Sequence, residues 1–160
     1  MKLRKLSRRH VIALTIFTII IAGVAAFAYF FLRQTPVTLS PEYYNGDAII
    51  EINAAGYAEL IKSEKSFVIM VDNPGCTTTA RMREFMTELP ANMQFSYYKI
   101  MWQDAKETSL HDYIKYFPSL AVIDHGRVAY YHRADEDADS EYYNNASALQ
   151  TWLEARIKFN

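Results

Sequence analysis

The chain has 160 residues, and its 17 basic and 18 acidic side chains leave a formal net charge of −1. Five of the 17 basic residues precede residue 11 and all 18 acidic residues follow residue 41, so from Arg33 onward 12 basic residues face 18 acidic ones, a formal charge of −6. This excludes a nucleic-acid-binding domain, since no basic stripe exists to replace the counterions of a phosphate backbone. The sequence also lacks a glycine-rich phosphate loop and a G-x-S-x-G elbow, which excludes a P-loop nucleotide-binding protein and a serine hydrolase.

The first predicted element is a transmembrane helix over residues 11–32. This run contains no charged residue and is bounded by basic residues on both sides. At 1.5 Å of rise per residue, a helix of that length spans roughly 33 Å, about the thickness of the hydrocarbon core of a bilayer. Its downstream end carries bulky residues from Tyr29 to Phe31 instead of the small residues of a cleavage site. The sequence therefore predicts a retained anchor and not a cleaved signal peptide.

The orientation of the anchor follows from its flanks. Residues 1–10 contain five Lys or Arg residues, whereas Arg33 alone directly follows the apolar run. Because basic flanks stay in the cytoplasm, we expect a single-pass protein with a cytoplasmic tail at 1–10 and an extracytoplasmic C-terminal domain. That location is normally oxidising and favours paired cysteines. Cys76 is the only cysteine, so no intrachain disulfide is possible.

The first half of the domain predicts alternating strands and helices. Residues 33–46 are rich in turn formers and lack a clean period, which is typical of a linker, so the domain is expected at 47–160. The elements that follow are a strand over 47–52, a helix over 54–64 with Asn53 as its N-cap, a strand over 66–72, and a helix from Cys76 to Leu89 stopped by Pro90 and Asn92. The strand over 66–72 is almost wholly apolar, as expected for a central strand covered on both faces.

The second half predicts a strand, a short helix and a hairpin. In chain order the elements are a strand over 94–102, a helix over 108–116, two strands over 119–124 and 127–132 around His125 and Gly126, an acidic loop over 136–145, and an amphipathic helix over 146–159. The short helix is expected to end before Pro118, because a residue that precedes proline avoids the helical region. This order predicts a three-layer α/β domain with a central mixed sheet.

Two segments carry a resemblance to a known family. They are N-P-G-C-T-T-T-A-R-M at 73–82, where a strand runs into a cysteine at the start of a helix, and K-Y-F-P-S-L-A-V-I-D-H-G-R-V at 115–128, where a proline opens the last hairpin. Together with the element order they resemble the thioredoxin-like superfamily over roughly residues 47–160. The sequence looks like a membrane-anchored variant in which the family's C-x-x-C pair has become C-x-x-T.

The resemblance implies roles for the residues of both segments. Cys76 stands in the place of the attacking cysteine and Thr79 in that of the resolving one, and Pro118 looks like the cis-proline that faces the sulfur. The Phe117–Pro118 peptide bond is therefore expected to be cis. The residues assigned to substrate binding are Thr77, Thr78, Phe117 and Ser119. Because Thr79 cannot resolve a mixed disulfide, dithiol cycling on this chain alone is not expected.

Three interpretations of Cys76 are open. At a helix N-terminus, unpaired N–H groups and the helix dipole stabilise a thiolate, and Arg81 and Arg83 would add positive potential. Cys76 then acts as a monothiol that forms mixed disulfides. Alternatively it is a relic in a domain that is now a redox-inactive binding module or an accessory subunit of a membrane or secretion complex. The third interpretation is a buried structural thiol.

Neither a metal nor a cofactor is predicted. Asp135, Asp137 and Asp139 alternate as in a calcium loop, but Ser140 and Ala146 stand where that motif needs glycine and glutamate. The histidines of the domain lack the spacing of zinc ligands. The expected partners are the membrane and an exported protein or small thiol.

Overall fold

The computed structural model describes residues 17–23, 35–75, 80–133 and 137–159. The chain divides into two compact units, Met1–Thr35 and Pro36–Asn160. Residues 17–23 are helical. The rest of the transmembrane helix predicted at 11–32 lies outside the described residues. Within the described ranges, no helix combines the length and apolar character that a membrane crossing requires.

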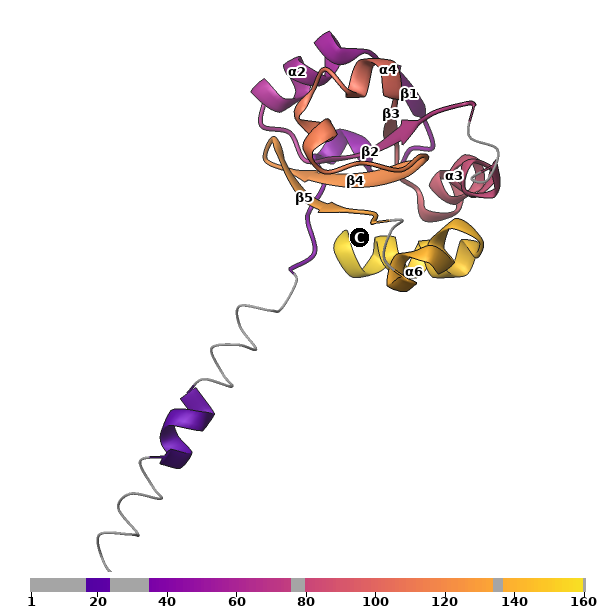
Figure 1. Ribbon diagram of the computed structural model, residues 1–160. Helices are drawn as coiled ribbons and strands as arrows, with labels where there is room; N and C mark the ends of the chain where they lie inside the picture. Colours follow the sequence, from indigo (N-terminus) through magenta and orange to yellow (C-terminus); the bar gives the residue numbers. More distant parts are fainter. Residues whose placement is uncertain (1–16, 24–34, 76–79, 134–136, 160) are drawn as a thin grey trace, which may run out of the picture. The chain divides into compact units, whose positions relative to one another are not determined.

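The second unit is built on a five-stranded mixed sheet (Figure 1). Its strands lie in the order β1-β3-β2-β4-β5. β1, β3 and β2 are parallel, whereas β4 is antiparallel to both β2 and β5. The strands are β1 (Ile49–Ile52), β2 (Phe67–Asp72), β3 (Tyr97–Met101), β4 (Ser119–Asp124) and β5 (Arg127–Tyr131).

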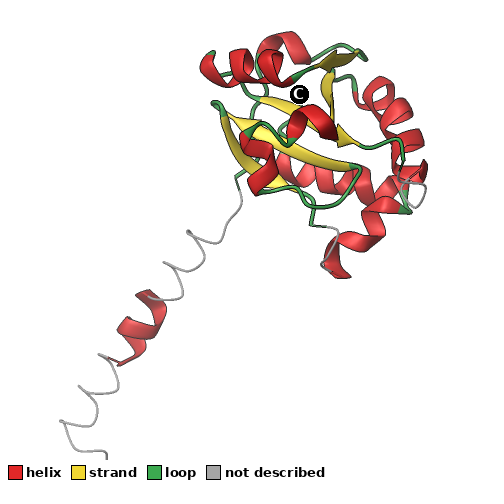
Figure 2. Cartoon of the chain, turned by 45° about the horizontal axis from the view of Figure 1, so that its top comes forward, coloured by secondary structure: helices red, strands yellow, loops and turns green. Residues whose placement is uncertain are grey.

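β2 is the central strand, and every one of its residues is buried. This matches the expectation from its apolar sequence, because a strand flanked by two others and covered on both faces buries its side chains whichever way they point. Figure 2 shows the sheet between its helices.

Helices cover both faces of the sheet. α2 (Ala54–Lys62) and α4 (Trp102–Ala105) lie on one face, and α3 (Ala80–Met93) and α6 (Ala146–Arg156) lie on the other (Figure 1). Asn53 caps α2, since its side chain accepts a hydrogen bond from the backbone N–H of Gly56. The shorter elements are η2 (Ser109–Asp112), α5 (Asp137–Ser140) and η3 (Glu141–Tyr143). The predicted three-layer α/β domain with a mixed sheet is thus confirmed.

The segment predicted as a linker belongs to the domain. The backbone N–H of Val37 bonds Arg156 O at 2.8 Å, and that of Lys158 bonds Val37 O at 2.9 Å, so this segment pairs with the chain after α6. Leu39 and Tyr43 are each only 2% exposed, and Tyr43 lies in the 3-10 helix η1 (Pro41–Tyr43). The predicted domain start at Asp47 is corrected to Pro36. The content of turn formers in this segment indicated a linker, but residues such as Pro41 also occur in turns that are packed against the domain.

Several element ends also differ from the prediction. α3 continues through Pro90 to Met93 and ends where Gln94 takes a φ of 55°, with the backbone N–H of Phe95 bonded to Pro90 O at 3.1 Å. The predicted helix over 108–116 is only the 3-10 turn η2, with Leu110 and Ile114 buried and Tyr113 exposed. The predicted acidic loop holds α5 and η3.

The predicted hairpin between β4 and β5 is confirmed. His125 and Gly126 have φ values of 46° and 74°, as a two-residue turn of this kind requires. A Cβ at position 126 would lie 2.6 Å from Ile61 O, so glycine is needed there for space as well as for conformation.

The first prediction concerns the corrected domain start. Leu39→Ala removes a side chain from the core and should lower the free energy of unfolding by about 2 to 5 kcal/mol. The matched control is Thr38→Ala, at an exposed neighbouring position, which should change that energy by less than about 0.5 kcal/mol. Urea unfolding of the full chain, followed by tryptophan fluorescence, measures both. Equal effects of the two substitutions would restore the linker interpretation.

Candidate functional site

One edge of the sheet gathers the ends of four strands. β1, β3 and β2 are parallel, so their carboxyl ends meet there, and the antiparallel β4 begins at the same edge. Asp72 pairs with Met101 of β3, and its neighbour Val71 pairs with Ser119 of β4. Pro118 therefore lies beside Asp72. Carboxyl ends of parallel strands are where α/β proteins usually bind ligands.

Pro118 is held at this edge by the residues on both sides of it. It is buried, and the Phe117–Pro118 peptide bond is cis, as predicted. The hydroxyl of Ser119 donates to Tyr116 O at 2.8 Å and shares a hydrogen bond of 3.0 Å with the hydroxyl of Tyr143. Ser119 is 1% exposed, so it is a structural support in this position and offers no surface to a substrate.

Aromatic rings border the proline. Phe117 lies against Trp102, with ring centroids 4.4 Å apart, and the ring centroid of His111 lies 5.4 Å from that of Trp102. Trp102 and Phe117 are half-buried and His111 is exposed. We call these three residues the aromatic platform. It combines apolar ring area with the polar N–H groups of an indole and an imidazole, a combination enriched at protein interfaces.

An ion pair fixes the end of β2. Asp72 is 3% exposed, and Nε of Arg83 donates to its two carboxylate oxygens at 2.9 and 3.1 Å. Arg83 also donates through Nη2 to Asn73 O at 3.2 Å. Through these bonds α3 holds the backbone at the point where the chain leaves β2. A carboxylate buried to this degree needs such a partner, because its desolvation is otherwise costly.

This ion pair changes the electrostatic argument for Cys76. Arg83 was expected to add positive potential near the sulfur, but its guanidinium neutralises Asp72. The negative charge of Asp72 also contributes to the raised pKa of the Tyr97 hydroxyl, after the larger effect of burial. Arg81 is exposed and is the remaining candidate for that role.

The predicted site residues fall into two groups. The structure brings Phe117, Pro118 and Ser119 to the carboxyl edge of the sheet. The other four, Cys76, Thr77, Thr78 and Thr79, lie outside the described residues, as does the expected helix start at Cys76. In the sequence this segment joins Gly75 to Ala80, the first described residue of α3.

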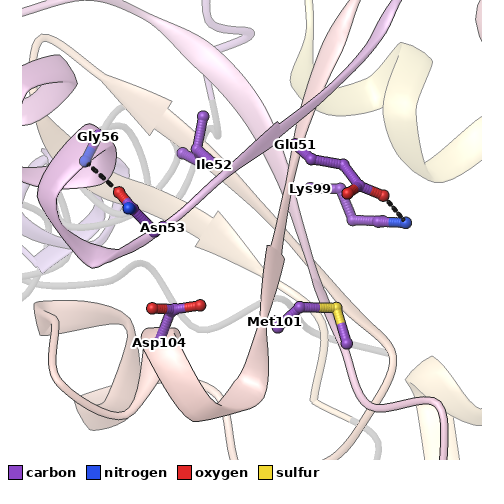
Figure 3. Close-up of a pocket in the computed structure, with 7 residues that line it drawn as sticks. All are labelled: Glu51, Ile52, Asn53, Gly56, Lys99, Met101 and Asp104. Atoms are coloured by element: carbon purple, nitrogen blue, oxygen red, sulfur yellow. Dashed lines mark hydrogen bonds and ion pairs between the residues drawn. The ribbon is translucent and has the colours of Figure 1, made fainter.

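A pocket of about 460 Å³ lies at the same edge, at the ends of β1 and β3 (Figure 3). Glu51 and Lys99 form an ion pair on its wall, and Asn53 accepts a hydrogen bond of 2.9 Å from the N–H of Gly56. These polar groups are thus engaged within the protein. Met101 and Asp104 complete the wall. Among the residues that the structure describes, no group of three or more His, Cys, Asp or Glu side chains could hold a metal ion.

Sequence reasoning missed Trp102, His111 and the pair of Asp72 with Arg83. One signal was available, since Asp72 is a charge at the end of an otherwise apolar run and such a charge needs a buried partner. The contact between Trp102 and Phe117 had no local signal, because it depends on how the ends of β3 and β4 lie around β2.

Neither a known protein family nor a curated protein matches the sequence. Solved structures do match. The oxidised thioredoxin O1 of Arabidopsis thaliana aligns with a TM-score of 0.52 at 12% identity, covering 69% of this chain and 99% of that one. A chain from a complex of ferredoxin:thioredoxin reductase with thioredoxin f2 aligns with a TM-score of 0.51 at 16% identity, covering 69% of this chain and 96% of that one.

Thioredoxin f from spinach chloroplast gives a TM-score of 0.50 at 14% identity, with 69% of this chain and 88% of that chain covered. The domain has the thioredoxin fold. At these identities the likeness concerns the fold alone. In this thioredoxin fold the Asp72–Arg83 pair, Pro118 and the aromatic platform together make the candidate site.

The second prediction concerns the ion pair. Arg83→Met leaves the Asp72 carboxylate buried without its partner and should cost about 3 kcal/mol of unfolding free energy. Adding Asp72→Asn to Arg83→Met should restore part of the loss, because the buried charge is then gone. Arg81→Met, at an exposed position of the same helix, is the matched control. Additive effects of the Arg83 and Asp72 substitutions in urea unfolding would contradict the pairing.

Proposed function

We propose that the chain is a membrane-tethered, extracytoplasmic protein whose thioredoxin-fold domain acts on exported proteins or small thiols through Cys76. One observation carries this proposal. The pairing of Val71 with Ser119 sets Pro118 beside Asp72, and Cys76 follows Asp72 by four residues in the sequence. The chain therefore leaves β2 next to Pro118 on its way to the cysteine.

The proposed reaction is the formation of a mixed disulfide. The thiolate of Cys76 attacks one sulfur of a partner disulfide, so a bond forms between the two sulfurs and the partner's disulfide breaks. Its second sulfur leaves as a thiolate and takes a proton from solvent. Thr79 cannot release the partner. An external thiolate therefore attacks the partner's sulfur in the mixed disulfide, forms a new disulfide with the partner and releases Cys76 as a thiolate. Thr77 and Thr78 are proposed to donate hydroxyl hydrogen bonds to the sulfur anion or to contact the partner.

A second candidate function is binding without chemistry. The aromatic platform supports it, because Trp102 and Phe117 keep part of their ring area accessible beside Pro118. In this version the domain recognises a partner of a membrane or secretion complex at the same edge of the sheet, and the sulfur of Cys76 plays no part. The two functions share a surface and differ in the reactivity of one thiol.

The proposed location rests on the N-terminal sequence. The apolar run at 11–32 is long enough to cross a bilayer, and its basic flank at 1–10 would remain in the cytoplasm. The acidic domain that follows would then lie outside the cytoplasm, where disulfides persist and can serve as partners.

The third prediction separates chemistry from binding. The rate of alkylation of Cys76 by iodoacetamide, measured against pH on the full folded chain, should report a thiolate pKa below the ordinary value of about 8.5. The same chain unfolded in urea gives the reference curve, and Cys76→Ser gives the background. Identical curves for the folded and unfolded chain would favour the binding function.

A restored C-x-x-C pair provides the matched gain-of-function test. Thr79→Cys supplies a resolving thiol, so a mixed disulfide with a model peptide should be released without added thiol. In the unsubstituted chain it should persist until external thiol is added. Release at the same rate from both chains would contradict the role assigned to position 79.

The fourth prediction concerns the anchor. The full chain should stay with the membrane fraction after alkaline carbonate extraction, and protease added outside intact cells or spheroplasts should digest the domain. Replacing Ile19 and Ile20 by Lys should release the chain, because two charges at the centre of a span are costly. Membrane retention of that variant would contradict the predicted span.

A further inference from the structure

The side of the sheet covered by α6 contains a buried histidine with no hydrogen-bond partner. His132 is 2% exposed, and neither Nδ1 nor Nε2 has a partner among the described residues. Its backbone N–H donates to Leu120 O at 2.9 Å, which fixes the residue at the end of β5. Buried polar atoms are rarely left in this state, so the arrangement calls for an explanation.

Aromatic rings enclose His132. Its ring meets that of Trp152 edge-on and stacks on that of Tyr142, with ring centroids 4.1 and 5.4 Å apart. The ring centroid of Tyr143 lies 5.7 Å from that of His132. The indole N–H of Trp152 is also buried without a partner among the described residues. Among the described residues, no acceptor bonds either ring nitrogen, so this cage suits a neutral imidazole better than an imidazolium, which has two N–H donors to satisfy.

The charged and titratable groups around the cage do not favour a second positive charge. On α6, the guanidinium of Arg156 lies 4.4 Å from the ring centroid of Trp152 and 5.9 Å from that of Tyr130 of β5. Arg133 follows His132 directly, and its backbone N–H bonds the carboxylate of Asp139 of α5 at 2.6 Å. From η3, Tyr142 and Tyr143 contribute phenols, and Glu141 is exposed.

Burial lowers the pKa of His132 from 6.5 to about 3, and the charge of Arg156 adds to that shift. The neutral form is therefore the one that fits the folded chain. Below pH 6.5 His132 takes up a proton when its ring is exposed to solvent but stays neutral while the ring is buried. The stability of the buried arrangement is therefore complete above pH 6.5 and is lost as the pH falls toward 3.

The cage is connected to the candidate site. Tyr143, one wall of the cage, shares its hydroxyl hydrogen bond of 3.0 Å with Ser119, and Ser119 follows Pro118. Residues 137–156, which comprise α5, η3 and α6 and which we call the C-terminal cap, thus contact both His132 and the support beneath Pro118. Opening of the cap breaks that hydrogen bond.

We propose that His132 is an acid-sensitive lock, whose protonation releases the C-terminal cap from the sheet and removes the Tyr143–Ser119 support beneath Pro118. The release of the cap is independent of what the site does. Its consequence for reactivity rests on the function proposed for Cys76.

Hydrogen exchange of the full chain between pH 8 and pH 5 tests the lock, with each rate divided by the intrinsic rate at that pH. Protection of amides in the cap should fall by up to about tenfold per pH unit below about 6.5, whereas amides of α2 on the opposite face keep their protection. His132→Phe should abolish this dependence. The control His125→Asn, at an exposed hairpin position that tolerates asparagine, should retain it.

The outcomes are separable. Unchanged protection of the cap in the unsubstituted chain, or the same fall in His132→Phe, overturns the lock. If His132→Phe does not fold, the unsubstituted chain still decides, since its cap must open on acidification before α2 does. If the cap opens on acidification but Cys76 is alkylated with the same pH dependence in the folded and the unfolded chain, the lock is supported and the proposed thiol function is contradicted.

Discussion

The pairing of β2 on both of its sides is the constraint on which the site depends. β2 is parallel to β3 and antiparallel to β4, so the end of one neighbour and the start of the other come to the same edge. The register then decides which residues meet there. Asp72, Met101 and Pro118 become neighbours although long stretches of sequence separate them. The ion pair with Arg83 fixes the same edge from the helix side, because it holds the backbone where β2 ends.

The sequence was sufficient for the architecture and insufficient for the domain start. The apolar run of β2 and the His125–Gly126 turn have strong local signals, since burial on both faces and positive φ values each restrict the residues allowed. The packing of Leu39 had no such signal. Its neighbours Pro36 and Pro41 are typical of linkers, and only the pairing of Val37 with the chain after α6 shows that this segment completes the fold.

The candidate site was likewise predictable only in part. The resemblance of 115–128 to a cis-proline segment correctly indicated the bond before Pro118. The aromatic platform could not be predicted, because Trp102 and Phe117 meet only once the order of strands is known. Two polar groups also behave differently from their sequence context. Arg83 compensates a buried carboxylate, and Tyr143, in a segment that reads as an exposed loop, is buried against Ser119. His132 is the converse case, a polar side chain that the fold encloses in its neutral form.

Disulfide trapping is the most direct test of the proposed placement of Cys76 across from Pro118. A cysteine at Phe117 should form an intrachain disulfide with Cys76 under mild oxidation, because a disulfide needs Cα atoms about 4.4 to 6.8 Å apart. A cysteine in place of Glu59, exposed on α2, should not. We expect rapid closure in the Phe117→Cys chain alone. No closure in that chain, or equal closure in both, would show that Cys76 does not lie next to Pro118.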